Sequence, residues 1–426
     1  MVNARLTDSA AAPEPRPGAG LKVVCVGGGP AGLYLSILMK LRDPSHDVAV
    51  FERSEINSSS GWGVTFGQSL LRRLYDHDRA CAREIEAAAF RWHDQVTHFQ
   101  GEQLVEHGGE AYNITRRRLL DILGGRAQDL GVRVEYGREI ASASEFPEAD
   151  VIVASDGVSS RIRQGAGSFR TQDVLGRNKY IWLGTDKVFE QFNFFFVPTE
   201  SGWIWAHAYG IDPDSSTFIV ECAPETWHRL GFASMSTDHA LPILEGIFKK
   251  PLAGHRLFGD LGDGSKARWL NFRTISNSRW HSGKVVLVGD SAHTTHFAVG
   301  MGTTLAIEDA IALADGLHEH RDIESAFESY ERQRRAEMAA TLAEASCSAR
   351  WFENLSRYID QKPRQFGALI YARRSPLIAV LPPAASYALR VAANRMTILD
   401  GVRHRVGPTV KKIYGRRKSV LSRGAP

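Results

Sequence analysis

The stretch Leu21–Arg53 decides the fold, and it reads LKVVCVGGGPAGLYLSILMKLRDPSHDVAVFER. A short valine-rich run comes first, followed by glycines spaced as G-x-G-x-x-G, a helical pattern and a second apolar run that ends at Glu52. A strand, a tight glycine turn and a helix in this order are typical of a dinucleotide-binding βαβ unit. The stretch therefore predicts a Rossmann-like domain.

Each glycine of the pattern has a physical role. Gly27 permits the tight turn, Gly29 lets the backbone approach a pyrophosphate, and Gly32 lets the helix pack closely on the sheet. The helix N-terminus offers unpaired N–H groups and a partial positive charge to the phosphates. Glu52 is placed to accept hydrogen bonds from a ribose diol. The sequence therefore predicts a bound adenine dinucleotide.

The composition is that of an ordinary globular protein. The chain has 426 residues, of which 43% are hydrophobic and 23% charged, and this length suffices for two interlocked domains. Its four cysteines are scattered without a Cys-x-x-Cys pair, so we expect a reducing, cytoplasmic setting and no disulfide framework or metal site. Residues 1–20 are expected to be a disordered lead. The segment nearest to a transmembrane helix, residues 375–393, is uncharged until Arg390 but is broken by Pro382-Pro383, so no integral membrane segment is expected.

The positive charge is concentrated in the tail, residues 401–426, which carries eight basic and no acidic residues. The net charge of the whole chain is +4, so residues 1–400 carry a net charge of 4 − 8 = −4. Two interpretations stay open: a solvated end, or a contact with an anionic carrier protein, nucleotide-bearing substrate or lipid surface. No other feature of the sequence indicates nucleic-acid binding.

Two further strand-to-turn junctions follow along the chain. The apolar run 150–155 leads into Asp156-Gly157, and the run 284–288 leads into Gly289-Asp290, a glycine-rich loop and a helix from Leu305. Residues 69–90 have helical periodicity, and residues 91–113 are expected to form strands joined by a turn at Gly108-Gly109. Between the two junctions, residues 176–222 contain four aromatic-rich runs that indicate an antiparallel sheet.

The three turns in this order resemble the class A FAD-dependent aromatic monooxygenases of the p-hydroxybenzoate hydroxylase type, over about residues 21–375. A narrower set of segments is similar to the branch that includes salicylyl-CoA 5-hydroxylase, anthraniloyl-CoA monooxygenase and the tryptophan hydroxylase of violacein biosynthesis. These segments are Arg177–Thr185, His207–Tyr209, Ser216–Cys222, His296–Thr303 and Ala349–Asn354. Phe297 departs from the family, since many members have proline there. We expect no barrel domain of the kind that the anthraniloyl-CoA enzyme carries.

The resemblance implies an α/β fold in three parts. An FAD-binding domain takes residues 21–90, 111–170 and 270–350. An inserted antiparallel-sheet domain for the substrate takes residues 91–110 and 171–269. A helical C-terminal region with the basic tail takes residues 351–426.

The resemblance also implies the chemistry. FAD would be the cofactor, with NADPH or NADH as a transient reductant, and O2 would be activated as the flavin C4a-hydroperoxide. The substrate would be a small aromatic compound of the salicylyl or anthraniloyl type, as a CoA or carrier-protein thioester. A free aromatic or indole intermediate is the alternative. The resemblance leaves the oligomeric state open between monomer and homodimer.

By the same resemblance, a set of residues would hold the cofactor. These are Gly27, Gly29, Gly32, Glu52, Arg53, Gly63, Arg116, Asp156, Gly289, Asp290, Gly300, Gly302 and Thr303. Arg116 would lie beside the phosphates, Asp290 would bond the ribityl chain, and Gly302-Thr303 would approach the flavin ring. Asp156 stays open between FAD and NAD(P)H.

His207, Tyr209 and His296 are the expected catalytic residues. A histidine could deprotonate a phenol and so raise its electron density, because its pKa lies near working pH. Each histidine is equally compatible with an ordinary buried position in the sheet.

Three other functions compete with hydroxylation. A flavin-dependent halogenase would need a Trp-x-Trp-x-Ile-Pro run, whereas Trp203-Ile-Trp205 is followed by Ala-His-Ala. A flavin oxidase or reductase without oxygen transfer is the second, and a binding protein that has lost its chemistry is the third. The complete set of glycines and aspartates in the turns argues against the last.

Overall fold

The structure is a computed structural model that describes residues 20–56, 62–260, 265–376, 381–389 and 391–392. The predicted disordered lead, apart from Gly20, and the basic tail lie outside the described residues.

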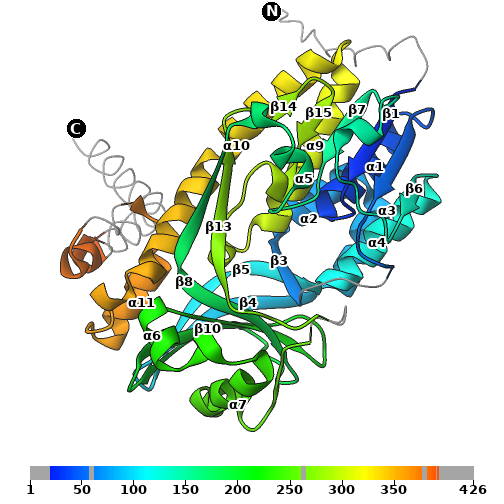
Figure 1. The fold of residues 1–426 in the computed structure, drawn as a ribbon. Helices are drawn as coiled ribbons and strands as arrows, with labels where there is room; N and C mark the ends of the chain where they lie inside the picture. Colours follow the sequence, from blue (N-terminus) through cyan, green and yellow to red (C-terminus); the bar gives the residue numbers. More distant parts are fainter. Residues whose placement is uncertain (1–19, 57–61, 261–264, 377–380, 390, 393–426) are drawn as a thin grey trace, which may run out of the picture.

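A six-stranded sheet forms the nucleotide-binding half (Figure 1). Its strand order is β14-β15-β7-β1-β2-β6, and all neighbouring pairs except β14–β15 are parallel. The strands are β1 (Lys22–Val26), β2 (Asp47–Phe51), β6 (Arg133–Glu135), β7 (Val151–Ala154), β14 (His281–Ser282) and β15 (Val285–Leu287). Residues of β7 are fully buried, as expected for a parallel strand covered on both faces.

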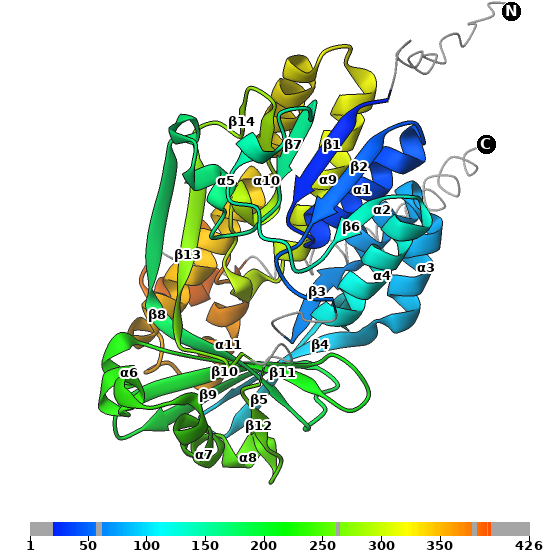
Figure 2. The same ribbon diagram turned by 45° about the vertical axis from the view of Figure 1, so that its right-hand side comes forward.

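A nine-stranded sheet forms the second half. Its order is β12-β8-β11-β10-β9-β4-β5-β3, with β13 paired to β8; the pairs are antiparallel except β4–β9, which is parallel. The strands are β3 (Gly63–Gly67), β4 (Phe90–Phe99), β5 (Glu102–Thr115), β8 (Thr171–Thr185), β9 (Phe192–Thr199), β10 (Gly202–Gly210), β11 (Ser216–Cys222), β12 (Leu257–Phe258) and β13 (Leu270–Asn277). Figure 2 shows β8 and β13 running from this sheet toward the six-stranded one.

Helices cover both sheets. They are α1 (Pro30–Arg42), α2 (Gln68–His77), α3 (Arg79–Ala88), α4 (Arg116–Asp129), α5 (Arg161–Gln164), α6 (Pro224–Arg229), α7 (Thr237–Ile247), α8 (Lys249–Leu252), α9 (Gly302–Glu319), α10 (Ile323–Glu353) and α11 (Pro363–Tyr371). Each half of the molecule has its own hydrophobic core, and the long helix α10 contributes to both. Phe327 and Tyr330 pack into the core around the six-stranded sheet, and Trp351 and Phe352 pack into the core around the nine-stranded sheet. None of the helices in the described part of the chain is long and apolar enough to cross a membrane.

The structure corrects one turn. The chain reverses at Gln100-Gly101, between β4 and β5, where both residues have positive φ angles (49° and 84°). Gly108 lies inside β5, where the pairing with β4 shifts register. A Gln-Gly pair is a weaker turn signal than Gly-Gly, but the cross-strand pairing of the flanking residues decided the turn.

The predicted domain limits cut across the sheets at three places. β3 and residues 111–115 of β5 belong to the nine-stranded sheet, although they were assigned to the nucleotide-binding part. β13 also pairs with that sheet through β8. The division into domains therefore stays a prediction. The two sheets assign β3, residues 111–115 and β13 to the same half as the predicted substrate domain.

Candidate active site

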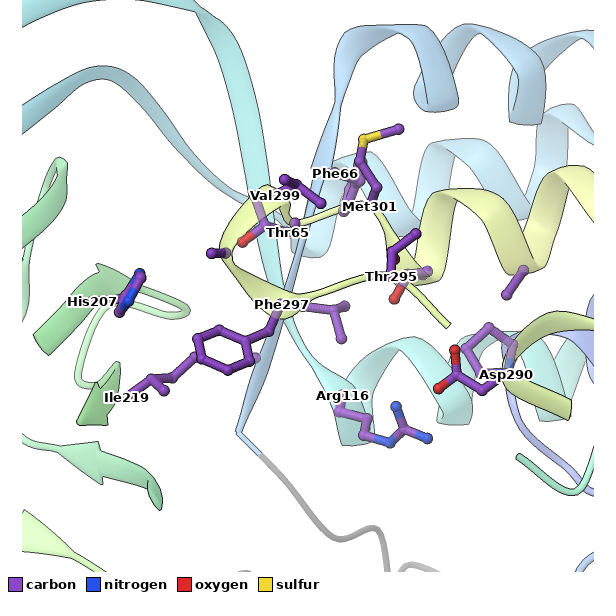
Figure 3. Close-up of a pocket in the computed structure, with 18 of the residues that line it drawn as sticks. Thr65, Phe66, Arg116, His207, Ile219, Asp290, Thr295, Phe297, Val299 and Met301 are labelled. Atoms are coloured by element: carbon purple, nitrogen blue, oxygen red, sulfur yellow. The ribbon is translucent and has the colours of Figure 1, made fainter. Parts of the chain in front are cut away.

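Two adjoining cavities lie where the two sheets meet. The larger has a volume of about 540 Å³ and the smaller about 310 Å³. Both are lined by Gly29, Arg116, Ser155, Gly157 and Asp290, so they form one elongated site. In Figure 3, Arg116 and Asp290 lie at one end of the larger cavity, and His207 and Ile219 lie at the other. We call these the cofactor end and the substrate end.

The glycine turn after β1 shapes the cofactor end. Gly27 has φ +111°, and a Cβ there would lie 2.3 Å from the Ser155 carbonyl oxygen. A Cβ on Gly32 would lie 2.2 Å from the Gly27 carbonyl oxygen. A Cβ on Gly29, by contrast, would meet no atom within 4 Å. The fold therefore requires glycine at positions 27 and 32, whereas Gly29 leaves open space at the N-terminus of α1.

Several carboxylates line the smaller cavity, among them Glu52 and Asp156. Glu52 accepts hydrogen bonds from the backbone N–H of Gly28 (2.7 Å) and of Ser54 (2.9 Å), which hold it at the end of β2 beside Arg53. Asp156 accepts a hydrogen bond at one oxygen from the N–H of Arg161 (2.8 Å). Its other oxygen, Oδ1, is buried without a partner in the described part of the chain, and burial raises the pKa of the carboxyl group.

Opposite charges face each other across the middle of the site. Arg116 is the first residue of α4, and its guanidinium makes no hydrogen bond to any described residue, whereas Arg117 and Arg118 are exposed. The Asp290 side chain is exposed and lines both cavities. Desolvation by the surrounding protein raises the pKa of Asp290, while His293 and Arg116 oppose the rise.

A buried ion network behind Gly289 was missed by the sequence analysis. Asp309 accepts hydrogen bonds from the Gly289 N–H (2.8 Å), the His293 ring (Nε2, 2.7 Å) and Arg334 (Nε, 2.8 Å). These partners hold the pKa of Asp309 below its usual range, although burial alone would raise it. Acidic residues on the buried face of a helix were the signal available in the sequence. The network holds the turn that presents Asp290.

The loop before α9 completes the cofactor end. Gly300 has φ +66°, and Gly300, Gly302 and Thr303 all line the larger cavity. A Cβ on Gly302 would meet no atom within 4 Å. Gly63, on β3, lines the same cavity, where its missing side chain leaves room for Ile211.

These observations fit a flavin dinucleotide. Two helix N-termini, those of α1 and α9, face one elongated site, with open space at Gly29 and Gly302. Arg116, whose guanidinium makes no hydrogen bond to a described residue, lies between them. Phosphates need such N–H groups and positive charge.

The substrate end is lined by aromatic rings and one histidine. Its rings include Tyr180, Trp182, Phe272 and Phe297. His207, on β10, is 1% exposed and lies against the rings of Phe194, Phe297 and Phe352.

A buried carboxylate lies behind His207. The His207 Nε2 atom is 3.4 Å from an oxygen of Glu221, on β11. Glu221 also accepts hydrogen bonds from Asn178 (2.7 Å) and Trp205 (3.0 Å). Burial lowers the pKa of His207, and Glu221 opposes this. Glu221 therefore lies beside the His207 ring at ion-pair distance, although Nε2 makes no hydrogen bond to a described residue, and no sequence signal had singled Glu221 out.

The other two predicted catalytic residues occupy different positions. Tyr209 lines the larger cavity, its hydroxyl donates to the Gly63 carbonyl oxygen (3.4 Å), and burial raises its pKa to about 12. His296 lines neither cavity: its ring packs against Phe272 and Phe297, and Nδ1 accepts the Ala298 N–H. Burial lowers the pKa of His296 to about 4. The structure thus brings His207 and Tyr209 together at the cavity and leaves His296 behind its wall.

A family model described as an FAD binding domain matches residues 20–345. The chain belongs to this family. It is 34% identical over 383 residues to a salicyloyl-CoA 5-hydroxylase from Streptomyces sp, covering 87% of this chain and 73% of that one. It is 32% identical over 338 residues to a 3-hydroxy-4-methyl-anthranilyl-[aryl-carrier protein] 5-monooxygenase from Streptosporangium sibiricum, covering 79% of this chain and 90% of that one.

Among solved structures, a tetrameric form of 2-methyl-3-hydroxypyridine-5-carboxylic acid oxygenase superposes with a TM-score of 0.66 at 21% identity, covering 86% of this chain and 98% of that one. This likeness concerns the fold alone. The predicted fold class and the predicted enzyme class are confirmed: the protein is an FAD-dependent aromatic monooxygenase. FAD supplies the redox and oxygen chemistry when bound, and NAD(P)H is the reductant typical of the family.

The monooxygenase has two more residues at its cavity that the sequence did not reveal. Arg373 and Arg374 follow α11 and line the larger cavity. Nothing in their local sequence points to a site, because the fold alone brings this segment beside the loop 297–299.

Proposed function

We propose that the monooxygenase hydroxylates an aromatic acid that is carried as a thioester of coenzyme A or of a carrier protein. The observation that carries this proposal is the identity of 34% and 32% to two enzymes whose names specify acyl groups bound in these two ways. The aromatic lining of the substrate end supports a planar ring as the reacting group.

The chain's own residues have distinct tasks in this proposal. The turns at Gly29 and Gly302 would bind the cofactor, Arg116 would lie by its phosphates, and Asp290 by its ribityl chain. His207 is neutral at working pH, because burial lowers its pKa. With the Glu221 carboxylate 3.4 Å from its Nε2, His207 would accept a proton from a ring hydroxyl.

Turnover with product analysis tests the proposal. NAD(P)H oxidation by the FAD-loaded enzyme would be compared for salicylate and anthranilate, each free and as the CoA thioester. We expect one thioester to speed NAD(P)H oxidation and to give a product about 16 mass units heavier, the mass of one oxygen atom. Hydrogen peroxide as the sole product with every thioester would contradict the assignment, and hydroxylation of the free acid alone would favour an uncarried substrate.

We also propose that the enzyme is located in the cytoplasm. All four cysteines are buried with free thiols, which supports a reducing, cytoplasmic location.

Two further properties are open to direct measurement. The same turnover assay, run with NADH and with NADPH, identifies the preferred reductant. Mass measurement of the purified holoenzyme in solution would separate monomer from homodimer.

A further inference from the structure

Arg373 is a buried cation at the wall of the larger cavity. It is 3% exposed, and its hydrogen bonds all go to neutral acceptors. Nε donates to the Ser348 hydroxyl (3.1 Å), Nη1 to the Ile370 carbonyl oxygen (3.0 Å) and Nη2 to the Ala298 carbonyl oxygen (3.0 Å). A guanidinium has about five N–H groups, so two are left for another partner.

No carboxylate pairs with Arg373 anywhere in the described part of the chain. The ring centroids of Phe194 and Phe352 lie 5.1 and 5.7 Å from its guanidinium carbon. Burial, together with the neighbouring Arg374, lowers the pKa of Arg373 to about 9, so the group is still charged at neutral pH. Burying a charge without a counter-ion is costly, and proteins normally pair such groups.

The other buried arginines show how this fold usually compensates such a charge. Arg334, 1% exposed, forms ion pairs with Asp309, Glu308 and Glu337. Arg163, 2% exposed, is within electrostatic range of Asp156 and Asp173. Among these three, Arg373 alone lacks an acidic neighbour in the described chain, and it alone lines the larger cavity.

We propose that Arg373 is the counter-ion for a negatively charged oxygen of the aromatic substrate. This inference rests on the proposed function and names the substrate class more closely. In a thioester the carboxylate is masked, so the charged oxygen would be a ring phenolate; in a free acid it would be the carboxylate. A phenolate held there would also be electron-rich, which suits attack by an electrophilic oxygen.

His207 lies in the same electrostatic neighbourhood. The charge of Arg373 contributes to the lowered pKa of His207, after burial, so the two groups sense each other. A phenol bound between them would lose its proton more readily, because the cation stabilises the anion. Arg373 would thus bind the oxygen, and His207 would be the nearby proton acceptor.

Ligand binding to the FAD-loaded enzyme tests this without turnover. Dissociation constants would be measured from changes in the flavin absorption for benzoate, salicylamide and benzamide in slightly alkaline buffer. Benzoate carries only a carboxylate, salicylamide only an ionisable phenol beside a neutral carbonyl, and benzamide neither. We expect the wild-type enzyme to bind one of the first two at least about tenfold more tightly than benzamide.

Three variants isolate the charge. Arg373→Gln should weaken the preferred anionic ligand about a hundredfold and change benzamide binding by less than about threefold. Arg373→Lys should recover part of the loss, because it keeps the charge without the fork of donors. Arg364→Gln, which removes an exposed positive charge from α11, should change nothing.

The outcomes separate the possible sources. If Arg373→Gln weakens the binding of benzoate selectively, the charged oxygen that Arg373 binds is a carboxylate. If it weakens the binding of salicylamide selectively, that oxygen is a phenolate. Equal weakening of all three ligands, or equal wild-type affinity for benzamide and both anions, would overturn the proposal. If Arg373→Gln fails to fold, the wild-type preference and Arg373→Lys still decide. Failure of both thioesters in the turnover assay would refute the proposed function and leave this binding result intact.

Discussion

The two ends of the larger cavity are built in different ways. The cofactor end consists mainly of backbone: glycine turns after β1 and β15 and the N-termini of α1 and α9. The substrate end consists of side chains from β8, β10, β11, β13, the loop 297–299 and the segment after α11. A ligand with fixed phosphates can be held by main-chain N–H groups, whereas a variable aromatic substrate needs specific side chains.

This difference has a consequence for mutation. At the cofactor end, the most sensitive positions are glycines whose replacement would place a side chain in the cofactor's space or against backbone atoms. At the substrate end, the most sensitive positions are residues whose replacement would remove a charge or a proton acceptor. Four experiments follow, and the first and the last compare the two ends directly.

Gly29→Leu tests the backbone end. A side chain there meets open space within the protein, so we expect the apoprotein to fold normally and FAD affinity to fall by at least about a hundredfold. The measurement is FAD titration, with thermal unfolding of the apoprotein as the check on folding. Gly246→Leu, also placed in open space but away from both cavities, is the matched control. Retained tight FAD binding would contradict the role of Gly29.

Arg334→Met tests the ion network that supports the cofactor end. Removing the cation leaves Asp309 buried with reduced compensation, so we expect a loss of about 3–5 kcal/mol in the free energy of unfolding. Denaturant unfolding measures it. Arg332→Met, at an exposed position of the same helix, should cost less than about 0.5 kcal/mol. Equal effects of the two variants would show that the network does not stabilise the fold.

His296 gives a pH dependence. Its folded pKa of about 4 lies below the usual 6.5, so the unfolded chain binds the proton more readily. The stabilisation is therefore complete above pH 6.5 and is lost as the pH falls toward 4, by about 3 kcal/mol in all. Unfolding of the wild type and of His296→Gln across this range measures the difference. The same pH slope in both proteins would contradict the assignment.

His207→Gln tests the side-chain end. We expect kcat for the hydroxylated substrate to fall about a hundredfold, as for loss of a general base, with FAD affinity unchanged. His98→Gln is the control, because His98 lies in the same sheet, on β4, but does not line the cavity. A comparable fall in kcat for both variants would show that the loss is not specific to His207 and would contradict its role as the proton acceptor.

Sequence reasoning was most effective where one short segment carries the whole feature. Gly27, Gly29 and Gly32 lie within six consecutive residues, and β1, the turn and α1 formed as expected. It failed at the β4–β5 turn, where the pairing of two strands overrode the local glycine signal. It could not tell that His207 lines the cavity while His296 lies behind its wall, because that depends on how the loop 297–299 packs.

The sequence alone determined the nucleotide-binding half and, through three spaced turns, the family, because glycine conformation and strand periodicity are local properties. The tertiary structure alone decided the chemistry of the substrate end. It placed Glu221 behind His207 and brought Arg373 to the Ala298 carbonyl oxygen, 75 residues away along the chain. Such contacts depend on the packing of sheets, a helix and a C-terminal segment, and no local pattern encodes that packing.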